Sequence, residues 1–267
     1  MPSFWASKDE KMKFFICPNL RTEKHVTLAD GVVERFRELG AECSMEEERC
    51  LRMYGNTRFA RFSPEEADLI VAIGGDGSVL RAAKLAVKLG KPLLGVNSGR
   101  LGFLCALDAM ETEKWTPEFL KNLTPAKRKL LSFTLGEKEY FSLNDVVIAK
   151  ENFGESMETE VSFCAEKHRF CGDGVIVATP TGSTAYNMSA GGALLHPDVS
   201  ALVVTPICPH DGRIRSKVIP SEAVVWITLL RSPGGKAQVY SDGELCGTIT
   251  DSLHVQIANK TLTLYTK

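Results

Sequence analysis

The sequence has no long apolar run and no excess of either charge. Within its 267 residues, no run approaches the roughly 18 consecutive apolar residues that a membrane-spanning helix needs. The formal net charge is −1 at pH 7, so no overall field steers the chain onto nucleic acid or an acidic membrane. We therefore expect neither nucleic acid nor a membrane as a partner, and any recognition of phosphate has to be local.

The sequence also lacks the cysteine pairs of a zinc ribbon and the apolar core of a secretory signal. The eight cysteines are scattered without a C-x-x-C pair, which argues against a zinc ribbon and against a thioredoxin-type site. The first residues, MPSFWASKDEKMKFF, lack the apolar core of a secretory signal. These absences lead us to expect a cytoplasmic protein with reduced thiols. With 44% hydrophobic and 24% charged residues, the composition is that of an ordinary globular protein of one large or two modest domains.

The stretch from 67 to 89, ADLIVAIGGDGSVLRAAKLAVKL, carries the strongest structural signal. Residues 69–73 form a short apolar run rich in β-branched residues, which predicts a parallel strand buried on both faces. Beyond the glycine turn at 74–78, the apolar positions fall at helical spacing, so the turn joins a strand to a helix. Free N–H groups and the helix dipole at such a turn favour an anion, and we expect phosphate there.

The carboxylate inside this turn needs its own explanation. Asp76 places a negative charge within a few ångströms of any bound phosphate, so a loop that only cradled phosphate would be better without it. Asp76 could hold a cation that bridges phosphates, or it could take the proton from a hydroxyl that attacks a phosphoryl group. Both interpretations imply phosphoryl transfer. The alternative is an ordinary turn residue, since Asp is a favoured turn former.

Strand and helix patterns alternate through the first half of the chain. Their order indicates a doubly wound, Rossmann-like α/β domain over residues 1–122. The expected elements are strands near 13–17, 41–44 and 91–96, a helix over 26–39 ended by Gly40, a solvated acidic run at 46–48 and a capped turn at 63–66.

A second glycine loop, NSGRLGFL at 97–104, follows the strand at 91–96. The carboxyl ends of parallel strands share one edge of a sheet, and that edge is where open α/β sheets bind ligands. The alternative is a plain glycine turn that places Leu101 and Phe103 in the core. The residues expected near Asp76 are Asn97 and the backbone of Gly99 and Gly102.

From about residue 123, helical periodicity gives way to short β-rich runs between turn residues. This spacing indicates a mostly antiparallel, sandwich-like domain. The stretch LNDVVI at 143–148 sets an amide and a carboxylate before an apolar strand, where they could hydrogen-bond a sugar diol or simply form a turn. The stretch at 172–192 supplies a strand, a small-residue loop with hydroxyls, a helix cap and one aromatic that could pack on a base.

Taken together and in this order, these motifs resemble those of the NAD kinase family. The resemblance covers most of the chain. The long motif separates this family from others that share the GGDG turn, which include diacylglycerol and sphingosine kinases and phosphofructokinases. The motifs are GGDGS at 74–78, NSGRLGFL at 97–104, LNDVVI at 143–148, GDGVIVATPTGSTAYNMSAGGALLHPD at 172–198 and VVTPICPH at 203–210.

The resemblance implies an enzyme that makes NADP by transferring the γ-phosphoryl group of ATP, or a phosphoryl group of polyphosphate, to the adenosine-ribose 2′-hydroxyl of NAD. It implies Asp76 as the general base, Mg²⁺ or another divalent metal, and a homodimer or homotetramer. The residues that it implies for substrate and nucleotide binding are Gly75, Gly77, Arg81, Asn97, Phe103, Asn144, Asp145, Asp173, Thr184, Ala185, Tyr186, Asn187 and Ser189.

The family architecture also implies a β-rich, NAD-binding domain over 123–252 and a return of the segment 253–267 to the first domain. Asp145 stands where the family more often has Glu, and Cys171 stands where a basic residue is often found. Two alternatives stay open. A lipid kinase of the GGDG superfamily would need an apolar or basic membrane-facing surface, which the sequence does not offer. A non-catalytic dinucleotide sensor could dispense with Asp76.

Overall fold

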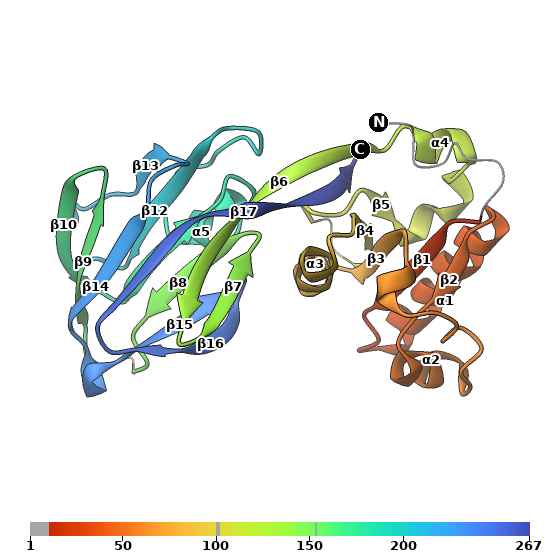
Figure 1. The fold of residues 1–267 in the computed structure, drawn as a ribbon, viewed down its shortest axis with the longest axis horizontal. Helices are drawn as coiled ribbons and strands as arrows, with labels where there is room; N and C mark the ends of the chain where they lie inside the picture. The colour runs from red at the N-terminus through yellow and green to blue at the C-terminus, as the bar shows by residue number, and fades with distance from the viewer. Residues whose placement is uncertain (1–10, 100–101, 153) are drawn as a thin grey trace. The chain divides into compact units, whose positions relative to one another are not determined.

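The structure, a computed structural model, describes residues 11–99, 102–152 and 154–267. The chain divides into two compact units, coloured from red to yellow-green and from green to blue in Figure 1. Unit 1 extends to Lys127 and includes Leu262–Lys267, and unit 2 comprises Arg128–Thr261. The last strand, β17 (Ser252–Thr266), therefore contributes residues to both units.

Unit 1 is built on a parallel sheet. All residues of its two central strands, β3 and β4, are buried, as the apolar run at 69–73 predicts for a strand covered on both faces. Next to β4, the strand β5 (Leu107–Asp108) and the end of β17 add further parallel pairs, with Leu264 opposite Leu93. The strand order is β2 (Glu42–Ser44), β1 (Lys13–Pro18), β3 (Leu69–Gly74) and β4 (Leu93–Asn97).

Helices cover both faces of this sheet. On one face, α1 (Glu23–Glu38) buries its apolar side in a cluster that includes Leu94 and Val96 of β4. Gly95 points to the opposite face because side chains alternate along a strand. There a Cβ atom on Gly95 would meet Val79 of α3 (Asp76–Leu89) at 3.0 Å. This is the doubly wound arrangement predicted from the alternating patterns.

Two helices of unit 1, α2 and the short α4, were not predicted. The acidic run expected as solvated surface leads into α2 (Glu47–Tyr54), which buries only Cys50. The capped turn is confirmed as the 3₁₀ turn η1 (Pro64–Glu66), with a capping box formed by Ser63 and Glu66. The remaining elements are η2 (Ala109–Lys114), α4 (Pro117–Lys121) and the start of β6 (Thr124–Leu135).

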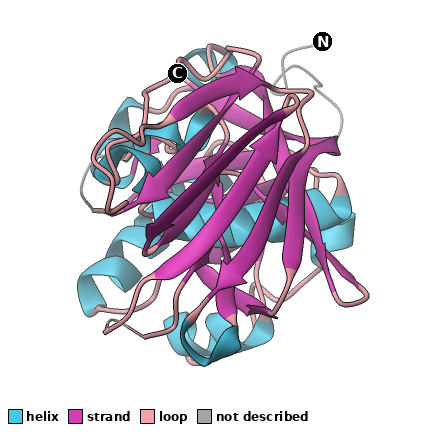
Figure 2. Cartoon of the chain, turned by 90° about the vertical axis from the view of Figure 1, so that its left-hand side faces the viewer, coloured by secondary structure: helices cyan, strands magenta, loops and turns pink. Residues whose placement is uncertain are grey.

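Unit 2 is a sandwich of antiparallel strands, seen from its side of the chain in Figure 2. Val146 and Val177 of the first sheet share one core cluster with Val161 and Ile227 of the second, which confirms the predicted sandwich. The first sheet has the order β13 (Lys217–Pro220), β12 (Ala201–Ile207), β11 (Gly174–Ala178), β8 (Asp145–Ala149), β15 (Ala237–Ser241) and β16 (Glu244–Ile249). The second has the order β10 (Glu166–Gly172), β9 (Met157–Phe163), β14 (Val225–Arg231) and β17, and β6 pairs with β17 and with β7 (Lys138–Ser142).

The outer face of the first sheet is covered by the chain that follows β11. This segment contains the short helices η3 (Thr181–Thr184) and α5 (Tyr186–Ser189). Ala193 and Leu195 pack there against Ile176 of β11 and Val203 of β12. The long motif thus lies across the same sheet that carries the LNDVVI motif at the start of β8. A further 3₁₀ turn, η4 (Pro233–Gly235), precedes β15.

Candidate active site

In unit 1, the glycine turn joins β3 to α3 as predicted. Gly75 is the N-cap residue of α3, and Asp76 is its first residue. A Cβ atom on Gly74 would lie 2.6 Å from the Cβ atom of Ser78, so only glycine fits at this position. Gly77 lies exposed in the first turn of the helix. Amide groups and the dipole at this helix end favour an anion.

The carboxylate of Asp76 points away from its own helix, to the second glycine loop. Oδ2 accepts a hydrogen bond from the Phe103 amide at 2.9 Å, and Oδ1 accepts one from the Leu104 amide at 3.1 Å. The loop comes so close that a Cβ atom on Gly102 would lie 2.6 Å from Cγ of Asp76. Each carboxylate oxygen can accept more than one hydrogen bond, so Asp76 is held in place and still has acceptor capacity.

The second loop therefore meets the turn at the sheet edge, as the parallel-sheet argument predicts. The Ser98 amide donates to the Gly74 carbonyl, and the side-chain amide of buried Asn97 bonds to the backbone of Gly99. Phe103 is 74% exposed, so its alternative placement in the core is wrong. Arg100 and Leu101 of the same motif lie outside the described residues.

In unit 2, the LNDVVI motif is clamped by a residue that the sequence analysis did not single out. The Asp242 carboxylate accepts three backbone hydrogen bonds, from Leu143 at 2.8 Å, Asn144 at 2.7 Å and Asp145 at 3.1 Å. Asp242 lies in the turn between β15 and β16, with a left-handed φ of 50°. The only signal in the sequence is the pair Asp242-Gly243 between two strand patterns, which predicts a turn and no partner.

The long motif holds this loop from another direction. Thr179 donates its hydroxyl to the Leu143 carbonyl at 2.6 Å, and its amide donates to the Asn144 carbonyl at 2.9 Å. A Cβ atom on Gly182 would lie 2.5 Å from the Cα atom of Asn144, so the two segments touch at backbone level. The backbone of 143–145 is thus held on two sides.

Asn144 has an orphaned polar atom. Its side chain is 7% exposed, and Oδ1 has no hydrogen-bond partner among the described residues. A buried acceptor without a partner is costly in a folded protein, at about 1–3 kcal/mol. The clamped backbone therefore presents an acceptor that a ligand hydroxyl would satisfy.

Replacing the clamp tests this arrangement. In Asp242→Asn, an NH₂ group replaces one accepting oxygen and faces a backbone N–H, so the loop loses part of its support. We expect the KM for NAD, the substrate that the resemblance implies, to rise about tenfold, equivalent to ~1.4 kcal/mol, and the free energy of unfolding to fall by about 1–3 kcal/mol. Steady-state kinetics and denaturant unfolding measure both. Asp251→Asn, in the exposed turn before β17, is the control; equal values for the two variants would contradict the clamp.

The pKa of the buried Asp145 carboxyl lies well above its ordinary value. Its burial, with a smaller contribution from the charge of Asp242, raises the pKa of its carboxyl from 3.8 to about 7. Between these two values, the folded state keeps a proton that the unfolded state has released. The contribution of Asp145 to the free energy of unfolding is therefore full below about pH 4 and is lost as the pH rises to about 7.

We expect Asp145→Asn to remove this pH dependence, because the amide resembles the protonated carboxyl and carries no charge. The difference in Tm between variant and wild type should then move in favour of the variant from pH 5 to pH 8. Thermal unfolding at several pH values measures it, and a constant difference would show that Asp145 does not titrate in this range.

The other predicted residues of unit 2 differ in their surroundings. Asp173 pairs with the nearly buried Lys150, Oδ1 to Nζ at 2.6 Å. Tyr186 is 46% exposed. Its partial burial raises the pKa of its phenol, and the nearby negative charges of Cys208, Asp173 and Asp145 raise it further.

Asn187 is fully buried and bonds to Ser183, Ala193 and Thr205, so in this structure its amide organises the loop. Of the small residues, Thr184 and Ala185 are partly buried, and Ser189 is exposed.

Solved structures share this two-unit fold. The crystal structure of yeast NADH kinase complexed with NADH superposes with a TM-score of 0.82 at 22% identity, covering 97% of this chain and 84% of that one. An NAD kinase from Archaeoglobus fulgidus in complex with ATP gives a TM-score of 0.72 at 22% identity, over 96% of this chain and 93% of that one. At this level of identity, the likeness concerns the fold, which is that of the NAD(H) kinases.

Sequence comparisons define the family. Residues 14–124 match the ATP-NAD kinase N-terminal domain, and residues 143–266 match the ATP-NAD kinase C-terminal domain. The NAD kinase of Lachnoclostridium phytofermentans is 32% identical over 229 residues, which are 82% of this chain and 80% of that protein. That of Petrotoga mobilis is 34% identical over 202 residues, 74% of this chain and 73% of that protein. The chain belongs to the NAD kinase family.

Proposed function

We propose that this chain transfers the γ-phosphoryl group of ATP to the adenosine-ribose 2′-hydroxyl of NAD, with Asp76 as the general base. The proposal rests on family membership and on one observation above all: the Asp76 carboxylate, beside the amino end of α3, is anchored by two amides of the neighbouring loop. A carboxylate at a phosphate-binding turn needs a chemical role, and this anchoring fixes where its charge lies.

The reaction balances with Asp76 as the only protein base. The 2′-oxygen forms a bond to the γ-phosphorus, the bond between that phosphorus and the bridging oxygen to the β-phosphate breaks, and ADP leaves with the electron pair. The proton of the 2′-hydroxyl passes to the Asp76 carboxylate and from there to solvent. Arg81, one turn along α3 with its Nη2 group 3.1 Å from the Ser78 hydroxyl, is suited to bind a phosphate.

In unit 2, we assign the dinucleotide to the clamped loop and the long motif. The orphaned Asn144 Oδ1 and the Asp145 carboxylate accept from the ribose hydroxyls. The half-exposed ring of Tyr186 packs on a base, and Asp173 contacts the nicotinamide end. Thr184, Ala185, Asn187 and Ser189 complete the lining. Phe103, Gly75, Gly77 and Asn97 belong to the corresponding loops of unit 1.

A divalent metal fits this donor set through the phosphates. The described residues contain no group of three or more His, Cys, Asp or Glu side chains that could hold a metal by themselves. Mg²⁺ commonly binds through substrate phosphates and water together with one or two carboxylates, so the phosphates would supply most of its ligands here, while Asp76 serves as the base. When bound, the metal would neutralise phosphate charge. ATP or polyphosphate is the proposed donor.

The test is direct formation of NADP. Purified protein is incubated with NAD, Mg²⁺ and either ATP or polyphosphate, and NADP is followed with an NADP-specific dehydrogenase. We expect product from the wild type. If neither donor gives NADP while NAD still binds, the protein is a dinucleotide sensor. The lipid-kinase alternative is not favoured by the relatives, and no helix among the described residues is long and apolar enough to cross a membrane.

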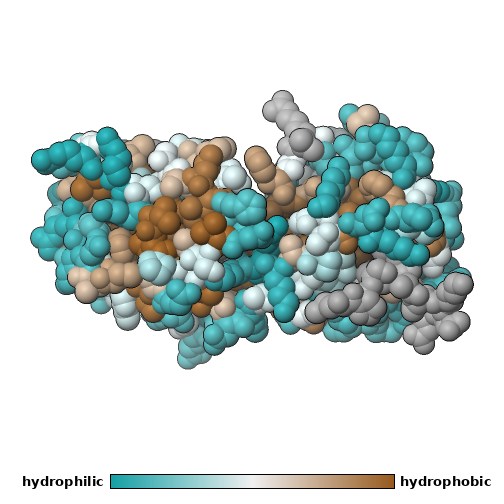
Figure 3. Space-filling model, turned by 90° about the horizontal axis from the view of Figure 1, so that it is seen from above, coloured by the Kyte–Doolittle hydropathy of each residue, from teal (hydrophilic) through white to brown (hydrophobic). Residues whose placement is uncertain are grey.

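We also propose a homo-oligomer located in the cytoplasm. Most of the described large hydrophobic residues with high exposure belong to unit 2, among them Val218, Trp226 and Leu245. Figure 3 shows apolar side chains gathered on the unit 2 side of the face seen there. Exposed apolar surface of this kind is typical of subunit contacts. All eight cysteines are free thiols, which supports a reducing compartment.

A further inference from the structure

At the end of β8, unit 2 holds an ion pair to which the proposed reaction gives no role. Nζ of Lys150 lies 2.6 Å from Oδ1 of Asp173. The two residues are also joined through the main chain, because the Lys150 amide donates to the Asp173 carbonyl at 3.0 Å. The Asp173 amide in turn donates to the Ile207 carbonyl at 2.9 Å. Asp173 is therefore fixed between the ends of β8 and β12.

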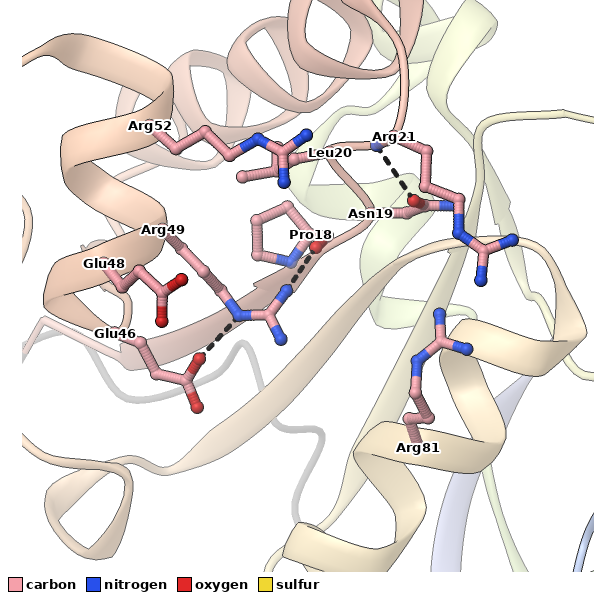
Figure 4. Close-up of a pocket in the computed structure, with 9 residues that line it drawn as sticks. All are labelled: Pro18, Asn19, Leu20, Arg21, Glu46, Glu48, Arg49, Arg52 and Arg81. Atoms are coloured by element: carbon pink, nitrogen blue, oxygen red, sulfur yellow. Dashed lines mark hydrogen bonds and ion pairs between the residues drawn. The ribbon is translucent and has the colours of Figure 1, made fainter. Parts of the chain in front are cut away.

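The cation of this pair is shielded from water. The Lys150 side chain is 10% exposed. A contrasting pair borders the cavity of unit 1 drawn in Figure 4, where Arg49 and Arg52 extend from α2, and Arg49 pairs with Glu46. The Arg49 side chain is 40% exposed, so water and salt weaken that pair. The shielded ammonium of Lys150 offsets the charge of Asp173 more completely.

The ion pair lies at the opposite end of β8 from the clamped loop. Asp145 opens β8 and pairs with Ala178 of β11, whereas Lys150 follows Ala149, the last residue of β8. At about 3.3 Å per residue, the four residues between the two ends of β8 span roughly 13 Å. A ligand that reaches from Asp145 to Asp173 therefore has to be long, as a dinucleotide is.

Tyr186 lies within electrostatic reach of both ends. Burial raises the pKa of its phenol, and the charges of Cys208, Asp173 and Asp145 raise it further. Its ring is half-exposed and is the one to which we assign a base. A ligand that runs from Asp145 past Tyr186 ends beside the ion pair of Asp173 with Lys150.

We propose that Lys150 sets the preference of the enzyme between oxidised and reduced dinucleotide, by neutralising the carboxylate at the nicotinamide end. The inference rests on the proposed function, which assigns that end to Asp173. The oxidised nicotinamide ring carries one positive charge, and the reduced ring carries none. An Asp173 carboxylate without its cation would attract the oxidised ring alone, whereas the ion pair presents little net charge to either form. Lys150 is thus a specificity-determining residue that acts through Asp173.

The test is the ratio of kcat/KM for NAD to kcat/KM for NADH, with ATP as donor and the products separated by chromatography. The rest of the two dinucleotides is identical, so the ratio isolates the ring. In Lys150→Gln we expect the ratio to rise about tenfold, because the partly exposed carboxylate keeps its charge and loses its cation. Lys150→Arg keeps the positive charge and should stay near the wild-type ratio. Lys236→Gln, which breaks the neighbouring ion pair with Glu151, is the matched control.

Two further variants show whether the effect passes through Asp173. Asp173→Asn leaves the Lys150 ammonium beside the ring, so the ratio should fall below that of the wild type. The double variant Lys150→Gln/Asp173→Asn removes both charges, and its ratio should return close to the wild-type value. A purely structural role of the pair would not move the ratio in opposite directions. Thermal unfolding of each variant reports whether it folds.

Three results would overturn the inference. The first is an unchanged ratio in both single variants. The second is an equal rise of the KM for NAD and for NADH in Lys150→Gln, because Lys150 would then bind a part that the two forms share, such as the diphosphate. The third is a raised ratio that persists in the double variant. If the wild type makes no NADP, the proposed function fails, and calorimetric titration with NAD and with NADH alone decides whether Lys150 sets the preference.

Discussion

Asp76→Asn should lower kcat for NADP formation by at least ~100-fold, the effect typical of a missing general base. The amide keeps an oxygen that can accept from the Leu104 or Phe103 amide, so the loop stays near its place. It cannot take a proton from the 2′-hydroxyl at neutral pH. Because the change affects the transition state more than the bound substrate, the KM for NAD should change far less than kcat.

The measurement is steady-state kinetics with calorimetric NAD binding alongside. Asp251→Asn, in an exposed turn of unit 2, should retain wild-type rates. Two outcomes would contradict the assignment. If Asp76→Asn keeps kcat within a few-fold of the wild type, the carboxylate is not the base. If NAD binding is lost together with activity, Asp76 is a structural or binding residue.

Gly102→Ala should be nearly as damaging, although the residue has no functional group. The new Cβ atom would lie 2.6 Å from Cγ of Asp76, and the two amides that hold the carboxylate follow immediately in the chain. Either the loop or Asp76 has to move. A displacement of about 1 Å in a reacting group can cost ~100-fold in rate, and we expect a loss of that order in kcat.

Gly99→Ala is the matched control, because a Cβ atom there meets no atom of the described residues within 4 Å. Both variants should unfold at a similar temperature, since the affected segment is a loop at the edge of the sheet. Normal activity in Gly102→Ala would show that the close approach of loop and carboxylate is not needed for catalysis. An equal loss in Gly99→Ala would point to a general effect on the loop.

The core of unit 1 could be predicted because its signals are local. The apolar run of β3, the glycine turn and the helical spacing of α3 are adjacent in the chain, and each follows from side-chain size and backbone freedom. The meeting of Asp76 with Gly102 also followed, since it needs only the rule that parallel strands end at a common edge.

The missed features depend on pairing between distant residues. Asp242 clamps amides 97 to 99 residues earlier in the chain, and no pattern near Asp242 reveals that contact. The helix α2 was not predicted because its eight residues bury only one side chain, so its sequence lacks the apolar periodicity by which helices are recognised. Arg49 and Arg52 were overlooked with it.

The strand β17 gives unit 1 a late step in biosynthesis. Leu264 pairs with Leu93, about 170 residues earlier, so this part of β4 has no β17 partner until those residues have been made (Figure 1). At about 5–20 residues per second, a ribosome needs roughly 10–30 s for that interval. Meanwhile the nascent sheet carries an open edge that can attract foreign strands, a natural target for chaperones. All of unit 2, including the larger part of β17, is synthesised within the same interval, so the residues that close the first sheet are made after those of the second unit.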